Sequence, residues 1–163
     1  MVVLRCTQKL LRRLRKTPVA EAPSSSTRLG DWYANVIFVD RKPLILAVSA
    51  RTLLPVLVPA RDSAALGSRL AGGVGQMLAA LGVPDRQVQE EQQHMAELVF
   101  ARTLSRQILG SMNDFDRMLD FGSGESLTSV ALRLAEAPCG PIGMESPDRA
   151  AVSVFANPSR KTL

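Results

Sequence analysis

The sequence predicts a single α+β domain over residues 1–163, in which a small, mostly antiparallel sheet from the N-terminal third is packed by helices from the remainder. Three observations predict it. Alternating and β-branched segments, typical of strands, are concentrated in the N-terminal third, and apolar residues at helical spacing follow. A chain of 163 residues can bury a core without disulfides or a metal. Its 46% hydrophobic and 21% charged residues are ordinary for a globular protein.

Strands and one helix are predicted in the N-terminal third. The predicted strands are Val2–Thr7, Trp32–Val39, Leu44–Ser49 and Leu53–Pro59. Residues 8–16 form a basic helix with leucines on one side, and an internal loop rich in proline and serine follows over 17–28. The polar residues 40–43 are typical of a hairpin connection. Pro55 and Pro59 lack N–H donors on the same side of their strand, so that strand is predicted at the sheet edge.

The rest of the chain is predicted to be mainly helical. Apolar spacing predicts four helices there: one over 62–82, one from Pro84 through Leu98 and Val99 to Ile108, one from Ser111, and one over 127–134. The tail, residues 137–163, contains four prolines and is predicted to be mostly irregular, although Val152–Phe155 could add a strand.

The net charge of +5 is concentrated at the N-terminus. Residues 1–30 hold seven Lys or Arg against Glu21 alone, a net +6, whereas residues 31–163 hold thirteen against fourteen acids, a net −1. Five cations of the basic helix are candidates for contacts with nucleic-acid phosphates: Lys9, Arg12, Arg13, Arg15 and Lys16. The pattern is equally that of an ordinary surface helix. No aromatic residues interleave with these cations along the sequence, although single-strand binders favour them.

The only tryptophan and the only tyrosine, Trp32 and Tyr33, are adjacent at the head of the predicted hairpin. Neighbouring strand residues point to opposite faces, so one ring is expected to anchor the core while the other faces a ligand or partner. Asn35 lies two residues after Tyr33 and shares its face. The hairpin is therefore the first candidate binding surface.

A second candidate surface is the predicted helix start near residue 113. Asn113 and Asp114 lie there, with Arg106 upstream, and they could form a polar site with Asn35 of the hairpin. Asn and Asp are also the commonest helix caps, so a structural role is the simpler interpretation.

No catalytic or metal-binding signature is recognisable. Cys6 and Cys139 form no Cys-x-x-Cys pair, so their spacing offers no zinc site and fits a reducing cytoplasm. His94 is the only histidine, and the glutamates and glutamines around it are typical of a solvated helix face. We therefore predict no catalytic residue, no metal and no cofactor. No run approaches the ~20 apolar residues that cross a bilayer, so no membrane partner is predicted.

Three segments resemble a family of small bacterial proteins known only as a domain of unknown function: Leu4–Leu11 (LRCTQKLL), Leu29–Asn35 (LGDWYAN) and Gly110–Phe115 (GSMNDF). The similarity extends to Arg51–Leu53 and Ala137–Pro141 and covers most of the chain. It implies a bacterial, cytoplasmic protein and names no activity. The motif residues that the resemblance singles out are Arg5, Thr7, Lys9, Trp32, Tyr33, Asn35, Asn113 and Asp114.

The leading hypothesis is a non-catalytic binding module for a protein or nucleic-acid partner, using the hairpin surface around Tyr33 and Asn35. One alternative is an enzyme that acts on a small anionic or phosphorylated substrate. In that enzyme Arg5, Lys9 and Arg51 would hold the anion, and Asp114 would be the base. That alternative requires these residues to converge in one pocket. The other alternative is a nucleic-acid-binding regulator that uses the basic helix.

Overall fold

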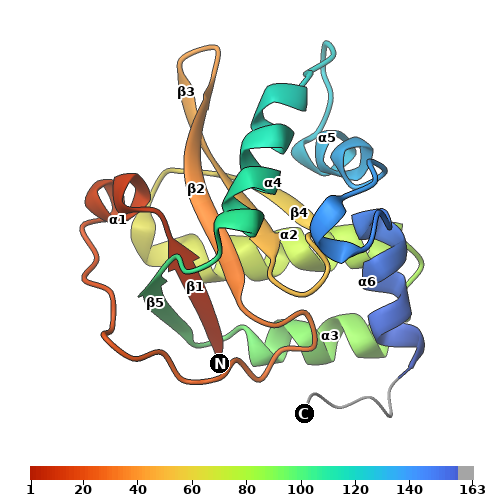
Figure 1. Cartoon of the computed structure of the whole chain (residues 1–163), viewed down its shortest axis with the longest axis horizontal. Coiled ribbons are helices and arrows are strands. Elements are labelled where there is room, and N and C mark those ends of the chain that lie inside the picture. The colour runs from red at the N-terminus through yellow and green to blue at the C-terminus, as the bar shows by residue number, and fades with distance from the viewer. Residues whose placement is uncertain (158–163) are drawn as a thin grey trace.

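The computed structural model describes residues 1–157, which fold around a five-stranded mixed sheet (Figure 1). The strands are β1 (Val2–Cys6), β2 (Trp32–Val39), β3 (Lys42–Ser49), β4 (Pro55–Pro59) and β5 (Leu98–Arg102). They lie in the order β4-β3-β2-β1-β5. β2, β3 and β4 pair antiparallel, whereas β1 pairs in parallel with both β2 and β5. The predicted α+β class is confirmed.

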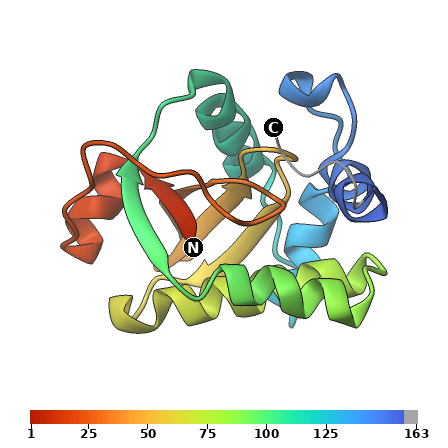
Figure 2. The same cartoon turned by 90° about the horizontal axis from the view of Figure 1, so that it is seen from below.

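Helices cover both faces of the sheet. They are α1 (Gln8–Leu14), α2 (Leu66–Ala80), α3 (Asp85–His94), α4 (Arg106–Met118), α5 (Leu127–Leu134) and α6 (Pro147–Ala156), with short 3-10 turns η1 (Ser63–Ala65) and η2 (Gly140–Ile142). Seen from below, α2 and α3 run along one face while α4 lies on the other (Figure 2). α5 packs against β4 at the sheet edge. No helix within residues 1–157 is long and apolar enough to cross a membrane.

The close approach of α2 identifies which strand residues face it. A Cβ on Gly73 would lie 2.7 Å from Val56 Cγ1, so only glycine lets the helix come this near to β4. Val56 pairs with Ala47 of β3, which pairs with Ala34 of β2, so these side chains share the α2 face. Tyr33 precedes Ala34 and therefore points to the opposite face, toward α4.

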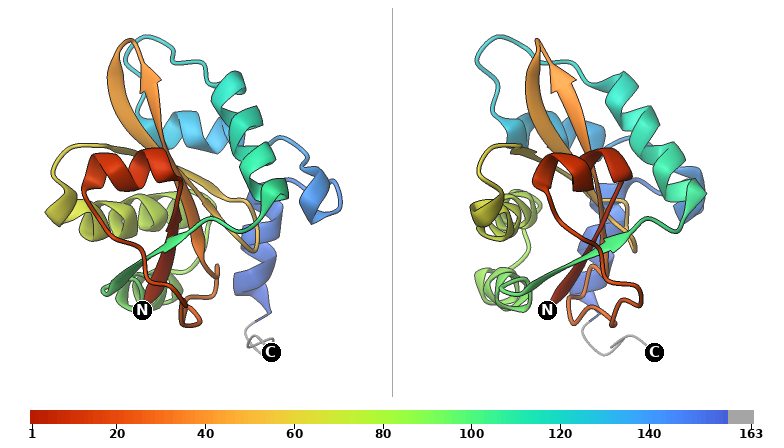
Figure 3. Two further views of the ribbon diagram at one scale, coloured as in Figure 1. Left: turned by 60° about the vertical axis from the view of Figure 1, so that its left-hand side comes forward. Right: turned by 90° about the vertical axis from the view of Figure 1, so that its left-hand side faces the viewer.

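The N-terminal elements match the predictions closely. The basic helix, the hairpin strands and the edge position of β4 are confirmed. The connection in the hairpin is shorter than predicted, because Asp40 and Arg41 both adopt positive φ (48° and 66°) and form a two-residue turn that suits the twist of the strands. The loop over 17–28 is also confirmed. It runs beside β5, where the Val19 N–H donates a hydrogen bond of 2.9 Å to the Phe100 carbonyl (Figure 3).

Three predictions for the C-terminal part are wrong. The helix predicted from Ser111 begins at Arg106, with Ser105 as its cap, so Asn113 and Asp114 lie inside α4 and not at its start. The helix predicted from Pro84 to Ile108 ends at His94, and residues 98–102 form β5 beside β1, because a short apolar run cannot by itself distinguish a buried strand from a helix. The tail is not mostly irregular over its described part: α6 begins at Pro147 and includes residues 152–155, where a strand was considered. Proline is favoured in the first turn of a helix. The predicted tail beyond residue 157 lies outside the described residues.

Candidate functional site

The hairpin does not expose either of its aromatic rings. Trp32 is 0% exposed and Tyr33 is 4% exposed, so the prediction that one ring faces a ligand or partner is wrong. The reason is that helices cover both faces of the sheet. On the α4 side, the Tyr33 hydroxyl accepts a hydrogen bond of 3.2 Å from the backbone N–H of Ser105, the residue that caps α4. Tyr33 therefore positions α4.

The polar motif residues on the same face of β1 and β2 bond one another and the neighbouring loop. Arg5 Nε donates to Asp31 Oδ2 at 2.8 Å, and its Nη1 donates to the Arg102 carbonyl at 3.0 Å. Thr7 Oγ1 donates to Asn35 Oδ1 at 2.6 Å and also caps α1. These groups are partly buried and their hydrogen bonds are used within the fold. They join β1, β2 and β5 at one end of the sheet.

The three cations considered for holding an anion do not converge. Lys9 Nζ lies 5.1 Å from the centroid of the Phe38 ring, whereas the Cβ of Arg51 lies 3.7 Å from the Cβ position of Gly30. Gly30 and Phe38 are separated mainly by β2, and eight residues at ~3.3 Å each span roughly 26 Å. Arg5, already paired with Asp31, is the third member. These three cations therefore do not form the single anion-binding pocket that the enzyme alternative requires.

The predicted second surface is divided between solvent and a pocket. Arg106 and Asn113 are exposed on α4, and no hydrogen bond within residues 1–157 joins them to Asn35. Asp114 forms an ion pair with Arg117 one turn later. Asp114 also lines a pocket of about 700 Å³ together with Cys139. The structure therefore separates Asp114 from the hairpin residues with which it was grouped.

Five cations in α1 and in the two residues that follow it form an exposed surface, which we call the α1 basic surface: Lys9, Arg12, Arg13, Arg15 and Lys16. The helix buries Leu10, Leu11 and Leu14 against the sheet, so its cations project outward. Within residues 1–157, none of the five forms an ion pair with a carboxylate. Their charge is therefore available to an anionic partner.

Folding places aromatic rings beneath these cations. Lys9 Nζ and Arg13 Cζ lie 5.1 and 5.9 Å from the centroid of Phe38, which is 52% exposed. Lys16 Nζ lies 5.7 Å from the centroid of Phe100. All three distances are within the range of cation–π contacts. This arrangement could not be predicted from the sequence, because Phe38 and Phe100 lie on strands that are distant from α1 along the chain.

A small pocket extends the α1 basic surface. Its volume is about 340 Å³, and it lies between the end of α1 and the end of β5. Four of its lining residues are cations: Arg12, Arg15, Lys16 and Arg102. Arg102, which sequence reasoning missed, joins the α1 cations because β5 pairs with β1. The positive charge is thus concentrated around this pocket.

Glu91 is buried, although its helix turn was predicted to be solvated. It is 1% exposed, and its two carboxylate oxygens accept hydrogen bonds of 2.7 and 3.0 Å from the backbone N–H groups of Arg28 and Leu29. Burial raises the pKa of Glu91, and the two backbone hydrogen bonds oppose that rise. Nearby, His94 Nδ1 lies 3.0 Å from Ser26 Oγ. Glu91 and His94 therefore hold the loop before β2 against α3.

The raised pKa of Glu91 gives a pH dependence of stability. The folded-state pKa exceeds the ordinary value of 4.5, so the group's contribution to stability is complete below that pH and is lost as pH rises through the folded-state pKa. Glutamine does not titrate. We therefore expect the wild type to lose stability relative to Glu91→Gln as pH rises from 4.5 toward neutrality. The measured quantity is the free energy of unfolding of the wild type minus that of the variant, and it should fall. Urea titrations across pH measure it, and a difference that rises with pH would contradict the expectation.

The described part of the chain holds neither a cluster of metal-ligating residues nor an activated thiol at Cys6. No group of three or more His, Cys, Asp or Glu within residues 1–157 could hold a metal ion. Burial raises the pKa of Cys6 to about 12, so its thiol stays protonated and a poor nucleophile.

The fold and these surfaces define a small α+β domain with a basic helix on one side of its sheet and an apolar pocket beside α4. The chain belongs to the domain of unknown function DUF6933, whose family model matches residues 3–150. This confirms the family resemblance seen in the sequence. No curated protein and no solved structure matches the chain.

Proposed function

We propose that this protein is a non-catalytic binding module that binds nucleic acid through the α1 basic surface. The observation that carries the proposal is the combination of five exposed cations without carboxylate partners, within residues 1–157, and an exposed Phe38 beneath two of them. Phosphates are neutralised by such cations, and bases stack on exposed rings. An ordinary surface helix needs neither feature.

Charge density supports a polyanionic partner in particular. Like charges one turn apart on a helix repel one another, so α1 is relieved of repulsion when phosphates approach. Arg102 adds a further cation around the small pocket at the end of α1. Without these five cations the chain has no net charge, since fifteen Lys or Arg remain against fifteen acids, so the attraction is concentrated on this side of the molecule.

The other functions considered have less support from the geometry. The hairpin face around Tyr33 and Asn35, the leading surface for a protein partner, is covered by α4 or bonded internally. The cations of the enzyme alternative lie at opposite ends of β2. The two free cysteines, Cys6 and Cys139, support our further proposal that this protein works in a reducing cytoplasm.

Binding of the purified protein to short single-stranded and duplex oligonucleotides across a salt series tests the proposal. Neutralising about five phosphates gives a slope of log K against log salt of about −3.5 for single strands and −4.5 for duplex. Fluorescence anisotropy measures the affinity at each salt concentration. The absence of binding to either oligonucleotide at low salt would refute the proposed function.

A further inference from the structure

Phe38 is the only exposed aromatic residue within residues 1–157. It is 52% exposed, whereas the other aromatic residues there are buried or half-buried. It is the last residue but one of β2 and lies close to the hairpin turn. A single exposed apolar residue is common on a protein surface, so the groups that surround this ring decide its meaning.

Two cations of α1 lie on one side of the Phe38 ring. Lys9 Nζ and Arg13 Cζ are 5.1 and 5.9 Å from its centroid, and the two residues are one turn apart on the same face of the helix. They therefore approach the ring from the helix side, and the rest of the ring is left to solvent. Neither cation forms an ion pair with a carboxylate within residues 1–157. Phosphates can be held here beside a base that contacts the ring.

A hollow of about 390 Å³ borders Phe38. The hairpin turn and the end of α4 line it, and no residue of α1 does, so it lies on a different side of Phe38 from the α1 cations. Its charged lining residues are all aspartates: Asp40, Asp116 and Asp120. Carboxylates repel a phosphate but do not repel a neutral base. The charges around Phe38 thus favour phosphates on the α1 side of the ring and a base on its open side.

We propose that the nucleic acid at the α1 basic surface is single-stranded, and that one unpaired base stacks on Phe38 while its flanking phosphates contact Lys9 and Arg13. This inference rests on the proposed function, which leaves open whether the strand is paired. Stacking on a ring requires a free base face, and inside a duplex both faces of each base are covered by its neighbours. Every base has such a face, so DNA and RNA of any sequence fit this contact.

The test compares one strand in two states. A strand of about 12 nucleotides, within the range of single-strand site sizes, is titrated alone and annealed to its complement, both as DNA and as RNA. At about 200 mM salt, where phosphate contacts are weakened, we expect the single strand to bind more tightly than the duplex. Fluorescence anisotropy measures both affinities.

Phe38→Leu removes the ring and keeps an apolar side chain beside α1. We expect the loss of one stacked base to weaken single-strand binding by about 5- to 150-fold. The slope of log K against log salt should not change, because no charge is lost, and duplex affinity should stay within about twofold. Phe38→Tyr retains a ring and should bind the single strand as the wild type does.

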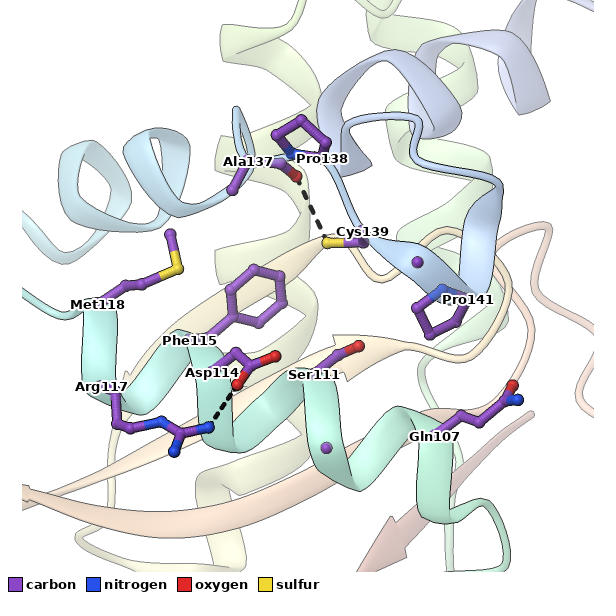
Figure 4. A pocket seen from close by; sticks show the side chains of 12 residues that line it. Gln107, Ser111, Asp114, Phe115, Arg117, Met118, Ala137, Pro138, Cys139 and Pro141 are labelled. Atoms are coloured by element: carbon purple, nitrogen blue, oxygen red, sulfur yellow. Dashed lines mark hydrogen bonds and ion pairs between the residues drawn. The ribbon is translucent and has the colours of Figure 1, made fainter.

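Met118→Ala is the matched control. Met118 is 48% exposed, close to the value for Phe38, and it points into the pocket of about 700 Å³ beside α4 (Figure 4). It lines neither the hollow at Phe38 nor the pocket at the end of α1. We expect this variant to bind both forms of the strand as the wild type does. Unfolding midpoints close to that of the wild type separate a lost contact from a misfolded protein.

Three outcomes would overturn the inference. They are equal or tighter binding of the duplex at about 200 mM salt, unchanged single-strand affinity in Phe38→Leu, and an equal loss of single-strand and duplex affinity in that variant. The last would mean that the ring only positions Lys9 and Arg13. In all three cases the protein still binds nucleic acid, so the proposed function stands. If neither form binds at low salt, the proposed function fails and this inference fails with it.

Discussion

Replacing three arginines of the α1 basic surface by alanine is expected to weaken nucleic-acid binding roughly a thousandfold at 50 mM salt, because each lost phosphate contact removes about one counterion-release step. The arginines are Arg12, Arg13 and Arg15. The same loss should reduce the slope of log K against log salt by about 3. All three side chains are exposed and unpaired within residues 1–157, so their removal leaves no buried group without a partner. Anisotropy titrations at several salt concentrations measure both quantities.

A matched variant separates local contact from net charge. Arg86, Arg117 and Arg149 are equally exposed but lie on α3, α4 and α6, and their triple alanine substitution removes the same total charge. We expect this control to change affinity by no more than a few-fold, through the general field of the protein. If both triple variants lose affinity equally, binding follows net charge and the α1 basic surface is not the contact. Unfolding midpoints of both variants should stay close to that of the wild type.

Much of the fold was predictable because its signals are local. The hairpin alternates regularly around a polar connection, and β4 carries prolines that only an edge strand accepts. β5 was missed for the opposite reason. Residues 98–102 have no alternating pattern of their own and become a strand because β1 supplies a parallel partner about a hundred residues earlier. A short apolar run next to a helix is ambiguous until such a partner is known.

The candidate site depended still more on contacts distant in sequence. Tyr33 was expected to face a partner, but α4 covers it from about seventy residues later, as the hydrogen bond from Ser105 shows. The aromatic rings missing from the basic helix are supplied by Phe38 and Phe100 of other elements. A sequence names the chemical groups in each element. Which groups share a surface is decided by the packing of elements. Only the cations of the α1 basic surface, which lie close together in the sequence, could be assigned to a surface in advance.

Glu91 shows how a buried carboxylate can be hidden in a polar segment. Its neighbours Glu90, Gln92 and Gln93 made the turn typical of a solvated face. Its hydrogen-bond donors, the N–H groups of Arg28 and Leu29, lie 63 and 62 residues earlier. Those N–H groups lie at the middle of a turn before β2, closed by the hydrogen bond from the Gly30 N–H to the Thr27 carbonyl. The turn leaves the N–H groups of Arg28 and Leu29 without a backbone acceptor, and the carboxylate provides one.

We expect Glu91→Ala to lower the free energy of unfolding by about 2–4 kcal/mol, because two buried backbone N–H groups lose their acceptors and each unsatisfied donor costs roughly 1–3 kcal/mol. The loss is partly offset, since the alanine variant no longer buries a carboxylate whose pKa is raised by desolvation. Urea unfolding at neutral pH measures the change. Glu90→Ala is the control: the Glu90 side chain is 44% exposed and pairs with Arg86 one turn earlier, so its removal should cost less than about 0.5 kcal/mol.

Hydrogen exchange distinguishes the mechanism from a general loss of packing. If Glu91 fixes the loop through its two acceptors, the amides of Arg28 and Leu29 should exchange much faster in Glu91→Ala than in the wild type, beyond the change in global stability. The exchange rates of the β2 and β3 amides should change only as far as the free energy of global unfolding changes, because the hydrogen bonds between these strands are intact. If Glu91→Ala is as stable as Glu90→Ala and the amides of Arg28 and Leu29 are still protected from exchange, water or another group replaces the carboxylate. In that case the loop before β2 is held by its other contacts and not by Glu91.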